Sequence, residues 1–256
     1  MLKRTRSLVL PLFFALISVG AHAAEDTTLN TPSSDHSDQN GWGGGAEMNA
    51  NISKGNTNIE TLGAAAEVDF KAVPFNTSLK GSYMRNRTDN IERARMIHGS
   101  LRTGFNITNN LDFFALGSFM QDRFRGIEHE WMATPGLGIY AVNSDMLSIR
   151  FEGGAGFLNE EYFPFTDTSR TFGVGTAGMG FRLKISDTAD LTDDILWVDP
   201  FNDGSDWRIN NVGAISSRMT KVLSLKVSQN TLYRKHAVAS HNGTDNYTTA
   251  AIVLKF

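Results

Sequence analysis

His98 and Ser100 are the residues whose types and spacing come closest to a catalytic pair. Two positions apart on one predicted strand, they share a face, and an imidazole beside a hydroxyl can activate it as a nucleophile against an acyl ester. An enzyme that uses such a pair on membrane lipid needs both side chains on its lipid-facing side. Ile97 and Leu101 of the same segment are apolar and have the opposite parity, which turns His98, Ser100 and Arg102 to the other face. We therefore expect a polar lining here and no catalysis, with a lipid-modifying esterase as the alternative.

Three aspartates, Asp199, Asp203 and Asp206, form the acidic group that a hard cation would favour. Carboxylate oxygens bind Ca²⁺ and similar divalent ions. The spacing departs from the D-x-[DN]-x-[DN]-G pattern of a calcium loop, and acidic residues in exposed loops are commonly just solvated. The chain has no cysteine, which excludes disulfides, thiolate metal sites and a cysteine nucleophile. The sequence thus predicts neither a metal nor a cofactor.

The first 24 residues predict a secretory signal peptide. Lys3, Arg4 and Arg6 precede an apolar run at 8–19, and Ala21 and Ala23 offer small side chains to a peptidase. The apolar run is shorter than the roughly 20 residues that span a bilayer as a helix, which disfavours a membrane anchor. Residues 25–40 are polar and acidic and predict a disordered leader. Residues 41–256 are expected to form one domain.

Charge and hydropathy narrow the class of protein further. Without the three basic residues of the signal, 24 − 3 = 21 Lys and Arg face 27 Asp and Glu, a formal charge of 21 − 27 = −6. This excess of acid disfavours nucleic acid as a partner. After the signal, no 12 consecutive residues are all apolar, which excludes a membrane helix. Only a closed β-barrel could still span lipid, because its strands satisfy every backbone hydrogen bond.

Short alternating segments, separated by Asn, Asp, Gly and Pro, fill the chain after residue 41, as is typical of strands and turns. Most have 10 to 16 residues, whereas ordinary strands have about five or six and tilted membrane strands need about 9 to 11. The pattern predicts an all-β, twelve-stranded antiparallel transmembrane β-barrel. The expected strands are 42–53, 58–72, 76–86, 92–107, 110–123, 129–142, 146–160, 168–185, 190–199, 206–219, 221–234 and 245–256.

The connections between these segments alternate in length. The even-numbered ones are tight, such as 73–75 and 108–109, while the odd-numbered ones are mostly longer, such as 86–92, 161–167 and 235–244. Outer-membrane barrels combine short periplasmic turns with longer external loops. The alternation therefore predicts a protein of the cell outer membrane with both ends of the barrel in the periplasm.

Charged side chains keep falling on one face of the predicted strands. In the seventh segment Phe151 opposes Arg150 and Glu152, because successive side chains of a strand point to opposite faces. A membrane barrel turns its apolar face to lipid and its polar face to the lumen. The ninth segment fits poorly, since Asp193 and Asp194 place a carboxylate on both faces. The predicted lumen-lining residues are Glu47, Glu67, Asp69, Lys80, Arg102, Arg150, Glu152, Arg208 and Lys226.

A soluble barrel or sandwich with the apolar face inside is the alternative architecture. It would enclose Arg150 and Glu152, and an unpaired buried charge costs several kcal/mol. Aromatic residues also favour the membrane interpretation, because they gather near both ends of the segments, as the girdles of membrane barrels do. The outer set comprises Tyr83, Phe119, Phe124, Trp131, Phe157, Phe172, Trp197, Trp207 and Tyr233, and the inner set Trp42, Phe70, Phe105, Phe113, Tyr140, Phe181 and Phe256.

Several short motifs resemble a known family in their order and spacing. They are WGGGA at 42–46, SKGNT at 53–57, DRF at 122–124, GLGIY at 136–140 and EGGAGF at 152–157. Together they resemble the salt-induced outer membrane proteins, a domain-of-unknown-function family, over nearly all of the chain after the signal. The resemblance implies an outer-membrane β-barrel and a link to salt stress. It supplies no catalytic residues.

The last segment ends at Phe256, with Leu254, Ile252 and Ala250 preceding it by steps of two. This resembles the terminal signature by which outer-membrane barrels are handed to their assembly machinery. The expected partners are therefore the barrel assembly machinery, outer-membrane lipid and lipopolysaccharide.

The strand count limits what the lumen can do. Barrels of about eight strands are filled by side chains, while 16 or more strands leave an open channel. Twelve strands predict a narrow, porin-like lumen. We expect a channel or envelope barrel for small solutes or ions, with a purely structural barrel and the esterase of His98 and Ser100 as alternatives.

Overall fold

The computed structural model describes residues 40–53, 59–122, 126–162, 169–202, 206–235 and 243–255. The predicted signal peptide, nearly all of the predicted leader, Asp203, Phe124 and Phe256 lie outside the described residues. Within the described part of the chain, no helix is long and apolar enough to cross a membrane.

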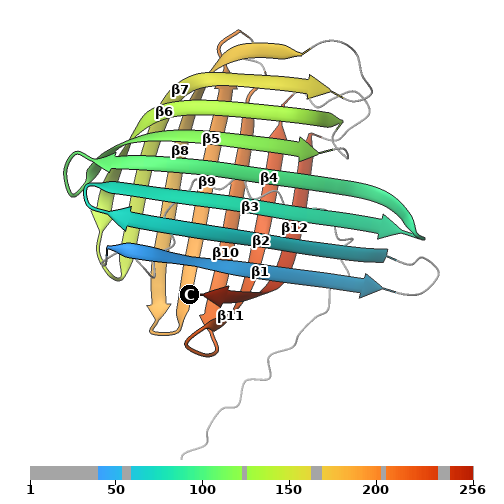
Figure 1. The fold of residues 1–256 in the computed structure, drawn as a ribbon, viewed down its shortest axis with the longest axis horizontal. Helices are drawn as coiled ribbons and strands as arrows, with labels where there is room; N and C mark the ends of the chain where they lie inside the picture. The colour runs from blue at the N-terminus through green and yellow to red at the C-terminus, as the bar shows by residue number, and fades with distance from the viewer. Residues whose placement is uncertain are drawn as a thin grey trace, which may run out of the picture.

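Twelve antiparallel strands close into one barrel, in which each strand pairs with its neighbours in sequence and β1 pairs with β12 (Figure 1). The predicted fold class is confirmed. Each predicted segment overlaps one strand, and the bounds differ by no more than two residues. The strands are β1 (Gly41–Ser53), β2 (Ile59–Ala72), β3 (Phe75–Thr88), β4 (Ile91–Asn106), β5 (Leu111–Asp122), β6 (Ile127–Asn143), β7 (Leu147–Tyr162), β8 (Arg170–Ser186), β9 (Ala189–Pro200), β10 (Arg208–Arg218), β11 (Leu223–Arg234) and β12 (Thr244–Lys255).

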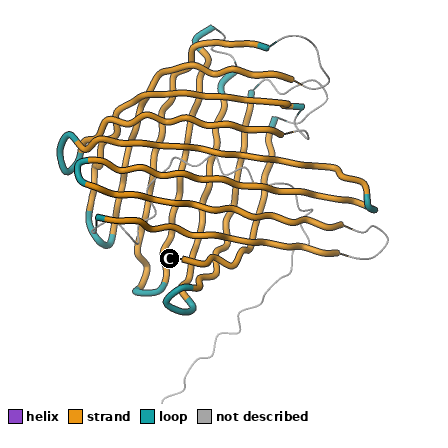
Figure 2. Tube along the Cα trace, viewed as in Figure 1, coloured by secondary structure: helices purple, strands orange, loops and turns teal. Residues whose placement is uncertain are grey.

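The two ends of the barrel differ. One end, here the turn end, carries the short connections after β2, β4, β6, β8 and β10, which gather together in Figure 2. It also carries Gly41, where β1 begins, and Lys255, where β12 ends. We call the opposite end the loop end. Even-numbered strands therefore run towards the turn end, as the predicted alternation of connections requires.

The connection from β3 to β4 differs from the prediction of a longer loop at 86–92. The two strands continue to Thr88 and Ile91 and leave only Asp89 and Asn90 between them. Both turn residues have positive φ, 50° and 62°, which matches the twist of a two-residue hairpin. Asp and Asn tolerate this left-handed conformation better than most residues. The polar composition of the segment suggested a loop, whereas its backbone conformation makes a tight hairpin.

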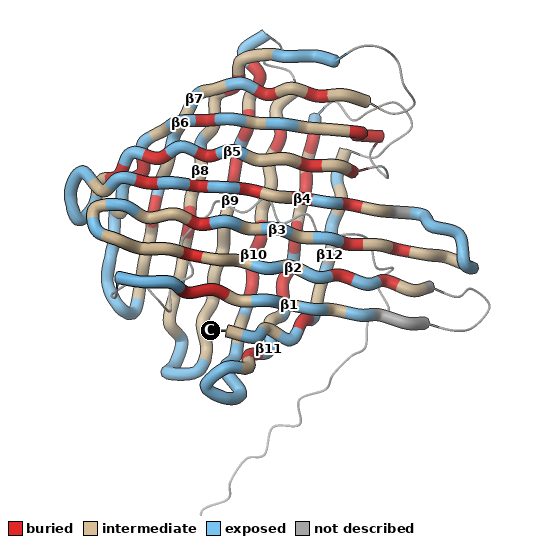
Figure 3. The backbone as a smooth tube through the Cα atoms, in the orientation of Figure 1, coloured by how far each residue is buried: buried red, intermediate tan, exposed pale blue. Residues whose placement is uncertain are grey.

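Side chains alternate between the outer wall and the interior, which Figure 3 shows most clearly as alternating exposed and buried positions on strands such as β5. Leu79, Leu101, Leu225 and Ile252 are exposed on the outer wall, at 45–59%. Arg102 and other polar residues are buried on the opposite parity. The predicted polarity, apolar outside and ionic inside, therefore describes most of the barrel.

An apolar cluster inside the barrel departs from that simple polarity. Leu158, Val174, Leu196 and Val198 pack together with relative exposures of 0–6%, and Met132 and Phe172 pack against them. These side chains come from β6 to β9, so one side of the lumen is filled with apolar side chains. Two residues placed in the aromatic girdles by sequence lie inside: Phe172 belongs to this cluster, and the ring of Tyr140 lies 5.5 Å below the Arg150 guanidinium. Whether a residue is odd or even within its strand decides if its side chain points outwards or inwards. Its distance from the end of the strand does not.

Candidate functional site in the barrel interior

All nine predicted lumen-lining residues lie on the inward parity of their strands. They do not form one continuous ring. Two of them, Arg102 and Arg150, are buried at the turn end together with Glu152, while Arg208 is buried at the loop end. Glu47, Glu67, Lys80 and Lys226 surround a cavity between these two ends, and Asp69 is buried on β2.

The turn-end cluster consists of Arg102, Asp112, Arg150 and Glu152. The Asp112 carboxylate accepts hydrogen bonds from the Arg102 and Arg150 guanidinium groups at 2.9 and 3.0 Å. Glu152 lies 3.0 Å from the Arg150 guanidinium and 3.6 Å from that of Arg102. Two cations and two anions therefore balance, and each side chain is at most 6% exposed. Buried charges persist when they are paired in this way.

Glycines on β6 make the space that the turn-end cluster occupies. A Cβ on Gly138 would lie 2.1 Å from the Arg150 guanidinium and 2.6 Å from the Asp112 carboxylate. A Cβ on Gly136 would lie 2.6 Å from the Phe114 ring, which itself lies 4.6 Å below the Arg102 guanidinium. Side chains of β5 and β7 thus meet over β6 at two inward positions, Gly136 and Gly138, that carry no side chain.

The loop-end network is the second ionic cluster and consists of Glu130, Glu160, Tyr162, Asp206, Arg208 and Arg234. Arg208 donates to Glu130 at 2.8 Å and also to Glu160. Arg234 donates to Asp206 at 2.7 Å, to Tyr162 Oη at 3.0 Å and to Glu160 at 3.4 Å. Tyr162 Oη donates to Glu160, whose side chain is 1% exposed. This carboxylate is therefore the centre of the network.

The loop-end network reaches across the lumen. Glu130 and Glu160 belong to β6 and β7, whereas Arg208 and Arg234 belong to β10 and β11. Arg208 and Arg234 are direct cross-strand neighbours, an arrangement of like charges that is unfavourable by itself. The three carboxylates around them offset this repulsion. Because the ion pairs join strands that are not neighbours, they occupy the space between walls.

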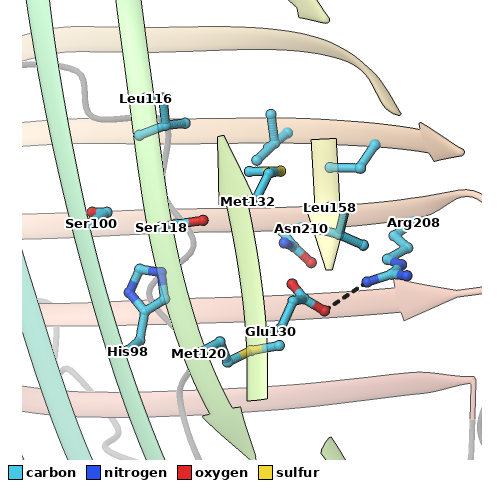
Figure 4. A pocket seen from close by; sticks show the side chains of 12 residues that line it. His98, Ser100, Leu116, Ser118, Met120, Glu130, Met132, Leu158, Arg208 and Asn210 are labelled. Carbon is cyan, nitrogen blue, oxygen red and sulfur yellow. Dashed lines mark hydrogen bonds and ion pairs between the residues drawn. The ribbon is translucent and has the colours of Figure 1, made fainter. Parts of the chain in front are cut away.

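Two cavities lie between the turn-end cluster and the loop-end network. The larger, of about 160 Å³, is lined by the Glu67–Lys80 and Glu47–Lys226 ion pairs, at 3.4 and 3.1 Å, and by Lys255. The smaller, of about 40 Å³, combines Ser118 and Asn210 with apolar side chains such as Leu116, Met132 and Leu158. Glu130 and Arg208 line this smaller cavity, and their ion pair is drawn in Figure 4. His98 is a lining residue of both cavities.

His98 and Ser100, the predicted esterase pair, point into the barrel. Their residues are 5% and 7% exposed, and both line the smaller cavity (Figure 4). The outer wall of the same strand is formed by Ile97 and Leu101, as the alternation predicts. The arrangement offers these two polar groups to a solute inside the barrel and withdraws them from lipid outside it.

Of the three residues in the predicted acidic group, only Asp199 and Asp206 belong to the described residues. Asp206 binds Arg234, Asp199 lies on β9, and Asp203 is outside the described residues. Among the described residues, no three His, Asp or Glu side chains are grouped as metal ligands would be. The carboxylate of Asp206 is satisfied by a guanidinium, so its role is to hold the loop-end network.

Sequence reasoning missed Asp112, Glu160 and Arg234, which hold the two ionic clusters together. Glu160 shares the parity of Arg150 and Glu152 on the same strand, so extending the alternation to the end of β7 would have found it. Arg234 likewise shares the parity of Lys226 on β11. Asp112 gives no such signal, because Phe113 and Phe114 make both faces of its segment apolar.

Comparison with solved structures supports the fold. The COG4313 outer membrane channel from Pseudomonas putida F1 aligns over 85% of this chain and 96% of its own, with 10% identity and a TM-score of 0.51. The translocator domain of the autotransporter NalP from Neisseria meningitidis aligns over 87% and 90%, with 12% identity and a TM-score of 0.48. At 10% identity the likeness to the Pseudomonas putida channel concerns the fold alone, which is that of an outer-membrane β-barrel.

Comparison of sequences gives the family. The uncharacterized protein YdiY of Escherichia coli (strain K12) is 25% identical over 243 residues, which are 93% of this chain and 92% of YdiY. The model of the family described as "Protein of unknown function, DUF481" matches residues 46–256, which contain nearly all of the barrel. The chain therefore belongs to the DUF481 family.

Proposed function

We propose that this protein is an outer-membrane barrel that passes small solutes or ions through a narrow path inside it. The observation that carries the proposal is the pair of interior cavities that share His98 as a lining residue. A barrel built only as a scaffold has no need of a polar cavity with ion pairs in its middle. Rings and pairs of charged side chains are how pores of this kind select and slow their solutes.

The path runs from the larger cavity, past His98, into the smaller cavity and towards the loop-end network. The apolar cluster fills one side of the lumen, and three of its members, Leu158, Leu196 and Val198, form part of the wall of the smaller cavity. The Glu130–Arg208 ion pair borders the smaller cavity and forms its boundary towards the loop end. The narrowest parts of the path are thus His98 and this ion pair.

The proposed orientation places the turn end in the periplasm and the loop end outside the cell. Short connections at one end and longer ones at the other are the arrangement of outer-membrane barrels. The outer wall supports a lipid environment, since exposed Leu101, Phe113, Leu137 and Phe151 belong to four neighbouring strands. Lipopolysaccharide and the barrel assembly machinery, which would recognise the end at Phe256, are the proposed partners.

Single-channel recording in planar bilayers tests the channel. The purified protein is expected to conduct, and His98→Trp is expected to reduce the conductance several-fold, because His98 lines both cavities and the indole takes up more of their space. Ile97→Trp is the matched control, on the same strand but on the outer wall, and should conduct as the native protein does. If the native protein shows no conductance over a range of salt concentrations, the channel is excluded and a structural barrel remains.

The esterase is the second candidate, and we propose instead that the protein has no lipid-modifying activity. His98 and Ser100 line the interior cavity, whereas the acyl esters of a bilayer lie outside the wall. Incubation with labelled phospholipid or lipopolysaccharide should give no turnover above that of the Ser100→Ala variant. Turnover by the native protein that the Ser100→Ala variant loses would establish the esterase.

A further inference from the structure

The outer wall carries a polar patch on β9 to β12 that the path inside the barrel does not use. On the outward parity, Asp193, Gly213, Gln229 and Thr248 stand in one row of directly paired positions across the four strands. In the adjacent row, Asn211, Thr231 and Asn246 are paired in the same way. We call the six polar residues of these two rows the wall patch.

Three side-chain hydrogen bonds connect the wall patch. The Asn211 amide donates to the Asp193 carboxylate at 2.7 Å, and the Thr231 hydroxyl donates to Asn246 at 2.8 Å. The Thr248 hydroxyl donates to Gln229 Oε1 at 2.5 Å. Gln229, Asn246 and Thr248 remain exposed on the surface. An amide offers two donors and two lone pairs. These three bonds therefore leave hydrogen-bond donors and acceptors of the patch available to a partner.

The wall patch is not the polar rim of the barrel. Towards the loop end it is followed by Trp197, Ile209 and Tyr233 on β9, β10 and β11. Towards the turn end it is followed by Leu191, Ile215, Val227 and Ala250. Polar groups that lie between an aromatic row and an aliphatic row face hydrocarbon, where polar groups without partners are costly. Most positions that face lipid on the other side, such as Leu101, Ala115 and Ala133, are apolar, and the polar pair Thr77–Thr103 there spans only two strands.

We propose that the wall patch is the interface through which two copies of this chain associate side by side in the membrane. Five of its six residues are neutral amides and hydroxyls, which both donate and accept, so the same patch on a second copy is complementary to it. Polar side chains and small residues are what hold membrane-embedded proteins together, since lipid supplies no hydrophobic drive for association. Gly213, in the middle of the patch, leaves room for close approach.

The position of Asp193, the charged residue of the wall patch, is compatible with two copies related by a two-fold axis. Asp193 lies on β9, at the edge of the wall patch, and is bound to Asn211. A two-fold axis along the membrane normal through the middle of the patch sets β9 of one copy against β12 of the other. The carboxylate then faces a strand that carries hydroxyl and amide groups, and the two carboxylates stay apart. The same carboxylate disfavours the phosphate groups of lipopolysaccharide as the occupant.

Cysteine cross-linking in native outer membranes tests the interface, because the chain has no cysteine of its own. Gln229→Cys, near the middle of the patch, is expected to give a disulfide-linked product of twice the monomer mass on mild oxidation. Ala115→Cys is the matched control, equally exposed on the opposite wall, and should stay monomeric. No dimer with Gln229→Cys, equal dimer with Ala115→Cys, or a product of another mass would overturn the proposal.

A second variant separates association from folding. Thr231→Val with Asn246→Leu keeps the strand pairing and removes hydrogen-bonding groups from the outer wall. We expect it to raise the dissociation constant of the detergent-solubilised dimer about tenfold or more, as measured by light scattering after size-exclusion chromatography. Its folding is checked by the heat-dependent shift in gel migration of intact barrels. A folded variant that dimerises as the native protein does contradicts the proposal.

Discussion

The turn-end cluster and the loop-end network contain the same kinds of side chain but join different parts of the barrel. In the turn-end cluster, the charges of β4, β5 and β7 lie along one stretch of the wall and meet over the glycines of β6. In the loop-end network, ion pairs run from β6 and β7 to β10 and β11 across the lumen. The first arrangement holds the wall together, and the second occupies the space through which a solute must pass.

Because of this difference, we expect the turn-end cluster to govern the stability of the barrel and the loop-end network to govern conduction through it. A balanced, fully buried group of charges is costly to break, because one partner is left without compensation in a place that water does not reach. Ion pairs that cross a lumen can exchange partners with water or with a passing ion, since the lumen continues into the cavities beside them. We therefore expect substitutions at the turn end to change stability and substitutions at the loop end to change the path.

The largest effect is expected from Asp112→Ala. It leaves the Arg102 and Arg150 guanidinium groups with Glu152 as their one remaining anion in the turn-end cluster. Removing one partner of a buried ion pair costs ~3–5 kcal/mol, so the free energy of unfolding in lipid vesicles, followed by tryptophan fluorescence in urea, should fall by that amount.

Glu47→Ala is the matched control for Asp112→Ala. It removes a carboxylate whose ion pair with Lys226 is about a quarter exposed, and exposed pairs contribute at most ~1 kcal/mol. Equal losses of stability in the two variants would show that the turn-end cluster has no special structural role.

Gly138→Ala should have the next largest effect. The added Cβ would overlap the Arg150 guanidinium and the Asp112 carboxylate, and overpacking of this kind costs ~1–3 kcal/mol. Gly117→Ala is the control, because a Cβ there meets nothing within 4 Å, and it should leave the urea midpoint unchanged or raise it. A Gly138→Ala protein as stable as the native one would mean that the cluster can shift to make room.

The third largest effect is expected from removing part of the loop-end network. Replacing Glu130 and Arg208 together by Gln removes the ion pair that borders the smaller cavity and leaves the net charge of the loop-end network unchanged. We expect the single-channel conductance to rise about fivefold, the equivalent of ~1 kcal/mol in a barrier. Arg85→Gln is the control, because its ion pair with Glu92 lies on the neighbouring strands β3 and β4 and does not cross the lumen. Unchanged conductance in the double variant would remove the loop-end network from the path.

The smallest effect is expected on ion selectivity. Lys80, Lys226 and Lys255 outnumber Glu47 and Glu67 around the larger cavity by one charge, which should favour anions weakly. Lys226→Gln should move the reversal potential measured across a salt gradient towards that of a cation-preferring pore. Lys221→Gln, in an exposed turn at the turn end, should leave it unchanged.

Strand parity explains how much of the interior was predictable. Arg150, Glu152 and Lys226 stand in segments where every second residue is apolar, so the sequence alone places them inside. The same rule fails at Asp112, Phe172 and Tyr140, whose segments carry apolar or aromatic residues on both faces. There the inward position follows from the register with the neighbouring strands, which sequence does not display.

The architecture of twelve long antiparallel strands and the ionic character of the interior follow from local patterns in the chain, because alternation with a period of two is a property of each strand alone. Which charges meet depends on how the strands are arranged in space. Glu160 and Arg234 are separated by 74 positions in the chain, and closure of the barrel and the stagger of its strands bring them together. The register between β9, β10, β11 and β12 likewise places Asp193, Gln229 and Asn246 in one patch of the outer wall, which no single strand contains.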